Sequence, residues 1–140
     1  MSTIPGEFIG KWELDRHENS EALFAALGVP ESLREKMASV KNTVDIREDD
    51  AVITIREGGL PGQPDRVQIF RLGEEREIES MFGKRLSVVT LEDGKLVRRN
   101  ANPDEDIVRG YRQVIDGELV MTATVVKTGV TANAFYKKID

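Results

Sequence analysis

The sequence predicts a mainly β fold, in which ten antiparallel strands close into an up-and-down barrel and a helix-turn-helix covers one mouth. Apolar residues recur at helical spacing between residues 18 and 40. From residue 43 onwards they alternate with a period of two, in short stretches joined by tight turns. Such stretches without intervening helices favour antiparallel hairpins, and closure into a barrel removes the exposed edges of an open meander.

The composition indicates one ordinary intracellular domain. The chain has 140 residues, a common size for a single domain, so we assign residues 1–140 to one barrel. Its 20 basic and 25 acidic residues give a net charge of -5, which argues against binding to nucleic acid. The absence of cysteine excludes disulfides and thiolate zinc sites. Because the sequence shows neither the pattern of a signal peptide nor an apolar run long enough to span a membrane, we expect a cytoplasmic protein.

The first strand and the first helix come early. The strand is expected from Phe8 to Leu14 and carries the only tryptophan, Trp12, on the same face as Leu14. A helix is expected over residues 18–27, followed by Gly28, which tolerates a left-handed turn at a helix end. The apolar side of this helix has helical spacing and consists of Leu23, Ala26 and Leu27.

A second short helix follows directly. Pro30 fits its first turn, where the missing N–H costs nothing. Leu33, Met37 and Val40 then lie at helical spacing. The two helices form an αα-hairpin over about residues 18–40, which we expect to act as a lid on the barrel.

Nine further strands are expected after the lid. Turn residues such as Asp93-Gly94 and Asp116-Gly117 separate them. The expected strands are Thr43 to Ile46, Ala51 to Arg56, Arg66 to Leu72, Glu75 to Met81, Leu86 to Leu91, Lys95 to Asn100, Ile107 to Val114, Glu118 to Val126 and Thr131 to Lys138.

The alternation within the strands predicts what faces inward. A barrel of more than about eight strands cannot be filled by its own side chains, so its inner face lines a cavity. One strand offers the apolar face Leu119, Met121 and Ala123, and another offers Leu96, Arg98 and Asn100. A third offers Val108, Gly110, Arg112 and Val114. The interior is therefore expected to be apolar with a few cationic and amide groups, and a buried arginine there requires a carboxylate.

Several short motifs, in this order and spacing, resemble the fatty-acid-binding proteins, a family of intracellular lipid-binding proteins. They are Gly10-Lys11-Trp12, Glu18-Asn19, Leu27-Gly28-Val29, Leu72-Gly73-Glu74-Glu75, Asp93-Gly94-Lys95-Leu96-Val97, Arg112 before Ile115-Asp116-Gly117-Glu118-Leu119, and the closing Phe135-Tyr136-Lys137-Lys138. The resemblance covers nearly the whole chain. It implies a ten-stranded barrel with a helix-turn-helix cap and a fatty acid inside.

The resemblance also implies how a ligand would be held. In the family, two arginines and a tyrosine bind the carboxylate of the ligand. Arg112 matches the first arginine and Tyr136 the tyrosine, whereas Ala134 stands at the second arginine position. The clamp is therefore incomplete, because alanine supplies neither charge nor a side-chain hydrogen bond. Leu23 and Met37 of the lid are further candidate ligand contacts.

Two other arginines could replace the missing one. If Glu75, Glu77 and Glu79 face water, Arg76 faces inward, and Arg98 lies on the inner face of its own strand. The alternative is that each arginine pairs with a nearby glutamate or extends to the rim of the barrel. Both interpretations remain open from the sequence.

The sequence offers no catalytic or metal-binding set. His17 is the only histidine, and with no partner histidine or cysteine we interpret it as a surface or capping residue. A Ser-His-Asp triad would depend on this one imidazole. We therefore expect no enzymatic activity, no cofactor and no metal.

The predicted function is binding and intracellular transport of a long-chain fatty acid or similar hydrophobic molecule by a monomer. One alternative is a carrier of retinoid or neutral lipid on the same fold. Another is a structural or protective barrel with no ligand. Lys36 and Lys41 could touch acidic membranes transiently through the lid, although the neighbouring glutamates weaken this interaction.

Overall fold

The computed structural model describes residues 3–59, 64–80, 83–102, 104 and 106–139, without the side chains of residues 37–39 and 80. A 3₁₀ turn, η1 (Gly6–Phe8), leads into β1 (Gly10–Glu18), α1 (Ser20–Ala26) and α2 (Glu31–Ser39). Nine strands follow, namely β2 (Thr43–Asp49), β3 (Val52–Gly58), β4 (Arg66–Phe70), β5 (Arg76–Ser80), β6 (Gly83–Glu92), β7 (Lys95–Asn100), β8 (Val108–Ile115), β9 (Glu118–Val125) and β10 (Thr131–Lys138).

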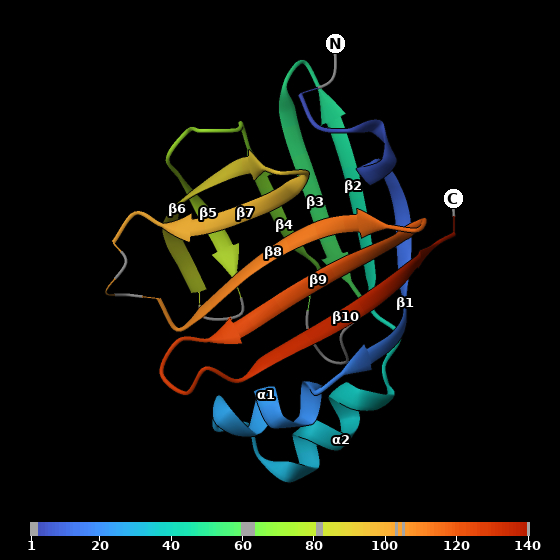
Figure 1. Ribbon diagram of the computed structural model, residues 1–140, viewed down its shortest axis with the longest axis vertical. Coiled ribbons are helices and arrows are strands. Elements are labelled where there is room, and N and C mark those ends of the chain that lie inside the picture. The colour runs from blue at the N-terminus through green and yellow to red at the C-terminus, as the bar shows by residue number, and fades with distance from the viewer. Residues whose placement is uncertain (1–2, 60–63, 81–82, 103, 105, 140) are drawn as a thin grey trace.

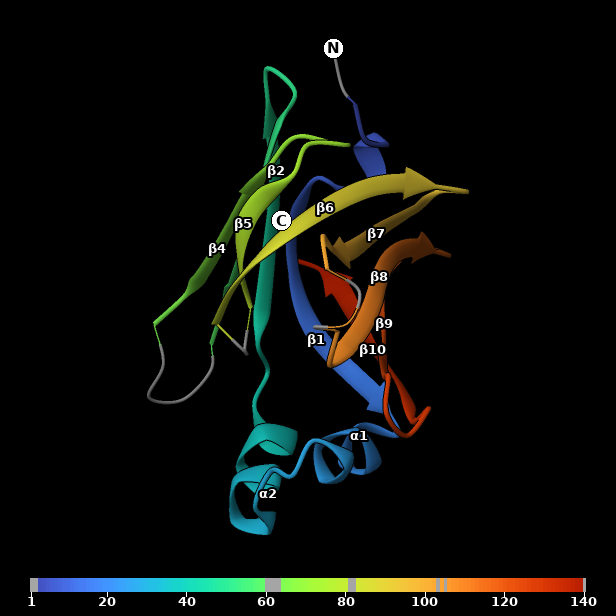
Figure 2. The same ribbon diagram turned by 90° about the vertical axis from the view of Figure 1, so that its left-hand side faces the viewer.

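The strands form one antiparallel, nearly closed barrel with the two helices across one end (Figure 1). In the described part of the chain the hydrogen-bonded order runs β4-β3-β2-β1-β10-β9-β8-β7-β6-β5. β4 and β5, the two ends of this order, are bridged by side chains. Gln68 Nε2 donates to the carbonyl of Glu79 at 3.1 Å, and Arg76 Nη1 donates to that of Ile69 at 3.4 Å. The view in Figure 2 shows how the strands wrap round the interior. The predicted fold class is confirmed.

The strand from Phe8 to Leu14 is the least accurate of the sequence predictions. Phe8 lies in the 3₁₀ turn, and β1 continues to Glu18. The polar residues at its end join the strand because they pair with β10, Arg16 opposite Phe135 and Glu18 opposite Asn133. Tertiary pairing here overrides local propensity. The first helix consequently begins at Ser20 rather than at residue 18. The last residue of the strand predicted from Glu75 to Met81 lies outside the described residues.

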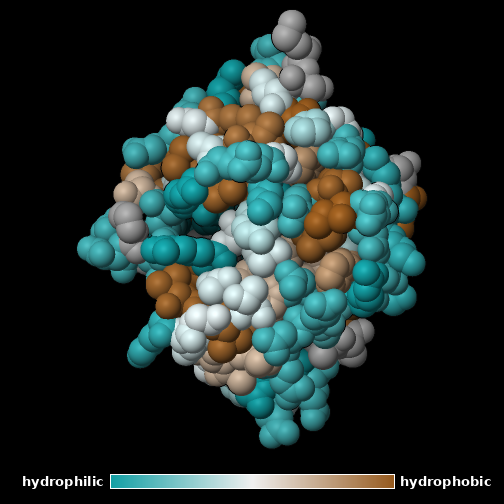
Figure 3. All heavy atoms as spheres, viewed as in Figure 1, coloured by the Kyte–Doolittle hydropathy of each residue, from teal (hydrophilic) through white to brown (hydrophobic). Residues whose placement is uncertain are grey.

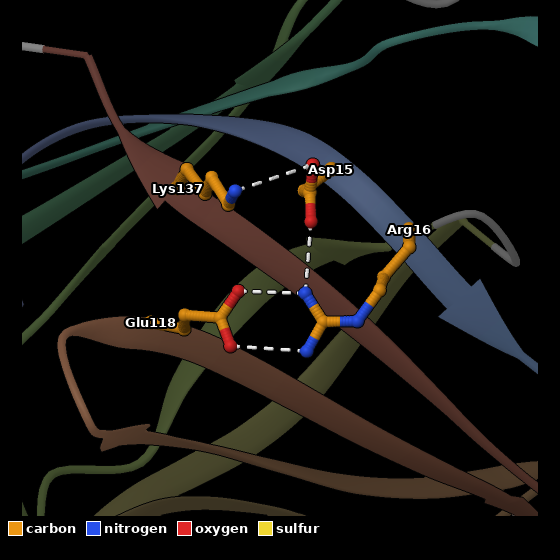
Figure 4. A network of polar contacts seen from close by, with 4 residues as sticks. All are labelled: Asp15, Arg16, Glu118 and Lys137. Atoms are coloured by element: carbon orange, nitrogen blue, oxygen red, sulfur yellow. Dashed lines mark hydrogen bonds and ion pairs between the residues drawn. The ribbon is translucent and has the colours of Figure 1, made fainter.

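A bulge in β1 organises the ion-pair network shown in Figure 4. The pairing with β10 shifts between Leu14 and Arg16, which leaves Asp15 as the extra residue. Arg16 then crosses the ring of Phe135 at 4.3 Å from its centroid and binds both carboxylate oxygens of Glu118 on β9, at 2.7 and 3.0 Å. These hydrogen bonds lower the pKa of Glu118. The network thus joins three adjacent strands on the outer surface.

Tight turns with two residues of positive φ connect several hairpins, as type I′ turns require. Asp93 (φ 50°) with Gly94 (φ 80°) and Asp116 (φ 51°) with Gly117 (φ 80°) lie where the sequence predicts turns. A third pair, Asp50 (φ 52°) and Ala51 (φ 65°), places an alanine in the left-handed region. A β-carbon is unfavourable in this region, so Ala51 is a strained position.

Replacing Ala51 by glycine is expected to stabilise the protein. Ala51→Gly removes the strain at φ 65°, which outweighs the added freedom of the unfolded chain. We expect the melting temperature to rise by about 3 to 5 °C, equivalent to about 1 kcal/mol. The matched reverse change, Gly94→Ala, meets no atom within 4 Å but imposes the same strain at φ 80°, so it should lower the melting temperature. A fall for Ala51→Gly in thermal unfolding would contradict this account.

Two clusters of buried residues lie at opposite ends of the barrel. The main core begins at the end covered by η1 with Phe8 and Trp12 and extends along the barrel to Phe70 and Tyr136. A smaller cluster of Leu23, Val125 and Ala132 lies under the helices and packs against Phe24 and Leu27. No helix in the described residues is long and apolar enough to span a membrane.

Candidate ligand-binding site

A cavity of about 300 Å³ occupies the barrel between the main core and the lid. Its apolar wall comes from α1 with its C-cap and from the strands, and includes Leu23, Phe24, Leu27, Phe70, Val89 and Met121. Figure 3 shows the contrast with the outside, where polar residues cover most of the visible face and hydrophobic residues form separate patches. The volume and the apolar wall are those of a small-molecule site.

Most of the residues that the sequence proposes for the site line this cavity. They come from α1, β7, β8, β9 and β10, and they are Leu23, Arg98, Asn100, Arg112, Met121, Ala123, Ala134 and Tyr136.

Three proposed residues are placed differently. Leu119 is fully buried in the main core and does not line the cavity. Arg76 lies between β4 and β5, where it pairs with Glu74 at 3.2 Å and its side chain is 39% exposed, which matches the alternative of pairing with a nearby glutamate. The side chain of Met37 lies outside the described residues.

The polar part of the cavity is centred on Glu57, a residue of β3 whose side chain is 11% exposed. One carboxylate oxygen, Oε2, lies 3.5 Å from Arg112 Nη2 and 3.8 Å from Arg66 Nη2. The other oxygen accepts a hydrogen bond of 3.0 Å from Gln68 Nε2. Glu57 is therefore the carboxylate that a buried arginine requires, shared between two arginines.

Arg98 completes a group of three arginines in the cavity. Its Nε donates to Ser87 Oγ and its Nη2 to the carbonyl of Ile78, both at 3.4 Å. Burial lowers the pKa of Arg98, as do the positive charges of Arg112 and Arg66, while Glu57 acts in the opposite direction. Arg98 thus bonds to neutral acceptors in a region that already contains two other cations.

Tyr136 presents a hydroxyl to the same region. Burial raises its pKa, so the phenol keeps its proton. Its oxygen accepts a hydrogen bond of 3.0 Å from Asn42 Nδ2, which leaves its own O–H free to donate into the cavity. Arg112 and Tyr136 therefore both offer hydrogen-bond donors to a cavity whose wall is mainly apolar.

Sequence reasoning misses several polar residues of this site. Glu57 lies on the inward face with Ile53 and Ile55, and that alternation is visible in the sequence. The prediction that His17 is a surface or capping residue needs correction, because His17 is half-buried near the end of β1 and lines the cavity. Among the described residues, no group of three or more His, Asp or Glu side chains could hold a metal.

Comparison with known proteins gives consistent results. The family model described as the lipocalin / cytosolic fatty-acid binding protein family matches residues 6–140. A liver fatty acid binding protein 1-A from Danio rerio is 36% identical over 137 residues, covering 95% of each chain. A liver-type fatty acid-binding protein from Epinephelus coioides is 30% identical over 135 residues, covering 95% of this chain and 96% of the relative.

A solved structure agrees with these relatives. The Schistosoma mansoni fatty acid binding protein in complex with arachidonic acid superposes with a TM-score of 0.79 at 27% identity, covering 96% of this chain and 98% of the other. The match of the family model over nearly the whole chain, together with these relatives, shows that the chain belongs to the lipocalin / cytosolic fatty-acid binding protein family.

Proposed function

We propose that this protein binds a long-chain fatty acid or a similar amphiphile inside the barrel and carries it without chemical change. The observation that carries the proposal is the position of Arg112 and Tyr136 beside an apolar cavity. A carboxylate there would accept charge-assisted hydrogen bonds from the guanidinium and a hydrogen bond from the phenol. Burial of the acyl chain would add about 0.8 kcal/mol per CH₂ group. The names of the relatives support this ligand class.

The polar lining disfavours a neutral lipid. Arg66, Arg98 and Arg112 line the cavity, and Arg66 and Arg112 share the carboxylate of Glu57. A neutral ligand such as retinol would leave three positive charges opposed by one carboxylate, whereas an anion supplies further negative charge. The absence of an arginine at Ala134 is therefore balanced by Arg66 and Arg98, which line the same cavity from β4 and β7.

The first test is the affinity of the delipidated protein for palmitate, measured by displacement of a fluorescent fatty acid. Arg112→Gln should weaken palmitate binding about tenfold or more, because a charge-assisted hydrogen bond is worth about 1.5 to 3 kcal/mol. Arg47→Gln is the matched control, because Arg47 lies on the outside of β2 and pairs with Asp45 at 2.7 Å. Unchanged affinity in Arg112→Gln would refute the role of Arg112.

The identity of the natural ligand is tested separately. Lipids released by denaturing the natively purified protein should be fatty acids or related acidic amphiphiles by mass spectrometry. Release of retinoid alone, or an empty barrel that also fails to bind palmitate, would contradict the proposal.

We further propose that the carrier acts as a monomer in the cytoplasm and that its lid touches acidic membranes only transiently.

A further inference from the structure

The cavity is positively charged although the chain as a whole is not. The full sequence has a net charge of -5. In the described residues, however, the lining contains four arginines, Arg66, Arg85, Arg98 and Arg112, against two carboxylates, Glu57 and Asp106. Asp106 is already paired with Arg109 at 2.9 Å. The surplus of positive charge is therefore local to the cavity.

Two of these arginines share one carboxylate, and a third lies near them. Arg66 and Arg112 share the same oxygen of Glu57, so their guanidinium groups face each other across a single atom. Arg98 is close enough for both of these cations to affect its ionisation. The three come from β4, β7 and β8, of which β7 and β8 are paired neighbours and β4 stands at the other end of the strand order.

Glu57 cannot neutralise this group alone. Its charge offsets one arginine, and a single fatty-acid carboxylate would offset a second. A third cation would then remain in a site where burial already opposes its charge. Removal of the imbalance requires two negative charges from the ligand.

We propose that the preferred ligand is an amphiphile whose polar end carries two negative charges, as an alkyl phosphate monoester does. This inference rests on the proposed function and specifies its ligand class. A phosphate monoester has three terminal oxygens that accept hydrogen bonds, and they share close to two negative charges well above the second pKa of about 6. These oxygens can accept from Arg112, Arg66 and Arg98 together, while the alkyl chain lies along the apolar wall.

The test compares ligands of equal chain length at pH 8 by calorimetry of the delipidated protein. Hexadecyl phosphate should bind about tenfold more tightly than palmitate, because it adds at least one charge-assisted hydrogen bond. Methyl hexadecyl phosphate, a diester in which a methyl group caps one oxygen and leaves a single charge, should lose this advantage. Hexadecanedioate, with its two charges at opposite ends, should also lack it.

Variants test which arginines cause the preference for hexadecyl phosphate over palmitate. Arg66→Met and Arg98→Met should each reduce the ratio of hexadecyl phosphate affinity to palmitate affinity by about threefold or more. Arg47→Met removes an equal charge from the outer surface and should leave the ratio unchanged. Because the ratio is taken within each variant, a general loss of stability does not alter the conclusion.

The outcomes separate the two proposals. If palmitate and hexadecyl phosphate bind with equal affinity, the inference about two charges is overturned while the fatty-acid carrier stands. Equal binding of the diester and the monoester, or preferred binding of hexadecanedioate, also overturns it. If neither palmitate nor any phosphate binds, the proposed function itself fails.

Discussion

Glu57→Gln is expected to lower the free energy of unfolding of the ligand-free protein by about 2 to 4 kcal/mol. The substitution keeps an oxygen that can accept from Gln68 Nε2 but removes the only carboxylate that Arg66 and Arg112 share in the described structure. Three arginines would then repel one another inside the barrel, largely shielded from water. Urea unfolding of the delipidated protein measures the change. Stability equal to that of the native protein would show that Glu57 does not balance the arginines.

The same variant should bind anionic ligands more tightly. Glu57 competes with the ligand for Arg66 and Arg112, so its neutralisation should increase palmitate affinity about tenfold. Ligand binding should then restore much of the lost stability, because binding to the folded state alone stabilises it. Glu77→Gln is the matched control, since Glu77 is exposed on β5 and changes the net charge equally. Weaker palmitate binding by Glu57→Gln would contradict the competition.

The sequence predicts the barrel well because the side-chain period of a strand reflects burial directly. Residues 95–100 and 131–138 form strands with the predicted bounds. The polar end of β1 could not be predicted, because Asp15 to Glu18 form a strand only through pairing with β10. Short-range patterns contain no information on such a partner, which lies more than a hundred residues away.

The sequence analysis did not predict Glu57 as the centre of the polar site for a related reason. The sequence predicts a strand that ends at Arg56, one residue before Glu57, and another that begins at Arg66. In the structure Glu57 and Arg66 lie directly opposite each other in the pairing of β3 with β4. Whether two residues face each other across strands depends on the register of the pairing. Considered alone, each of these polar residues next to a glycine-rich stretch is expected to be exposed to solvent.

The alternation of inward and outward residues also does not show how far along the barrel axis a residue lies. Leu119, Met121 and Ala123 share the inward face of β9, as predicted, but only Met121 and Ala123 line the cavity. Leu119 instead packs in the main core. Alternation therefore tells which face a residue occupies, whereas depth depends on how far the core fills the barrel from the end covered by η1.

That filled end is where the largest loss of stability is expected. Trp12 is 1% exposed in the main core, and its Nε1 donates to the carbonyl of Phe8 in η1 at 3.0 Å. Trp12→Ala should lower the free energy of unfolding by about 3 to 5 kcal/mol, because it leaves a large void and an unsatisfied carbonyl. Trp12→Phe keeps most of the volume and loses the hydrogen bond, so its loss should be smaller.

Ligand affinity distinguishes this effect from damage to the site. Trp12 does not line the cavity in the described structure, and the core separates it from the lid. Palmitate affinity of the folded fraction of Trp12→Ala should therefore stay within about threefold of the native value, while the urea midpoint falls strongly. A large loss of affinity in the folded fraction would mean that the main core and the cavity act as one unit. The predicted separation instead makes one end of the barrel the support for the fold and leaves the other free to bind ligand.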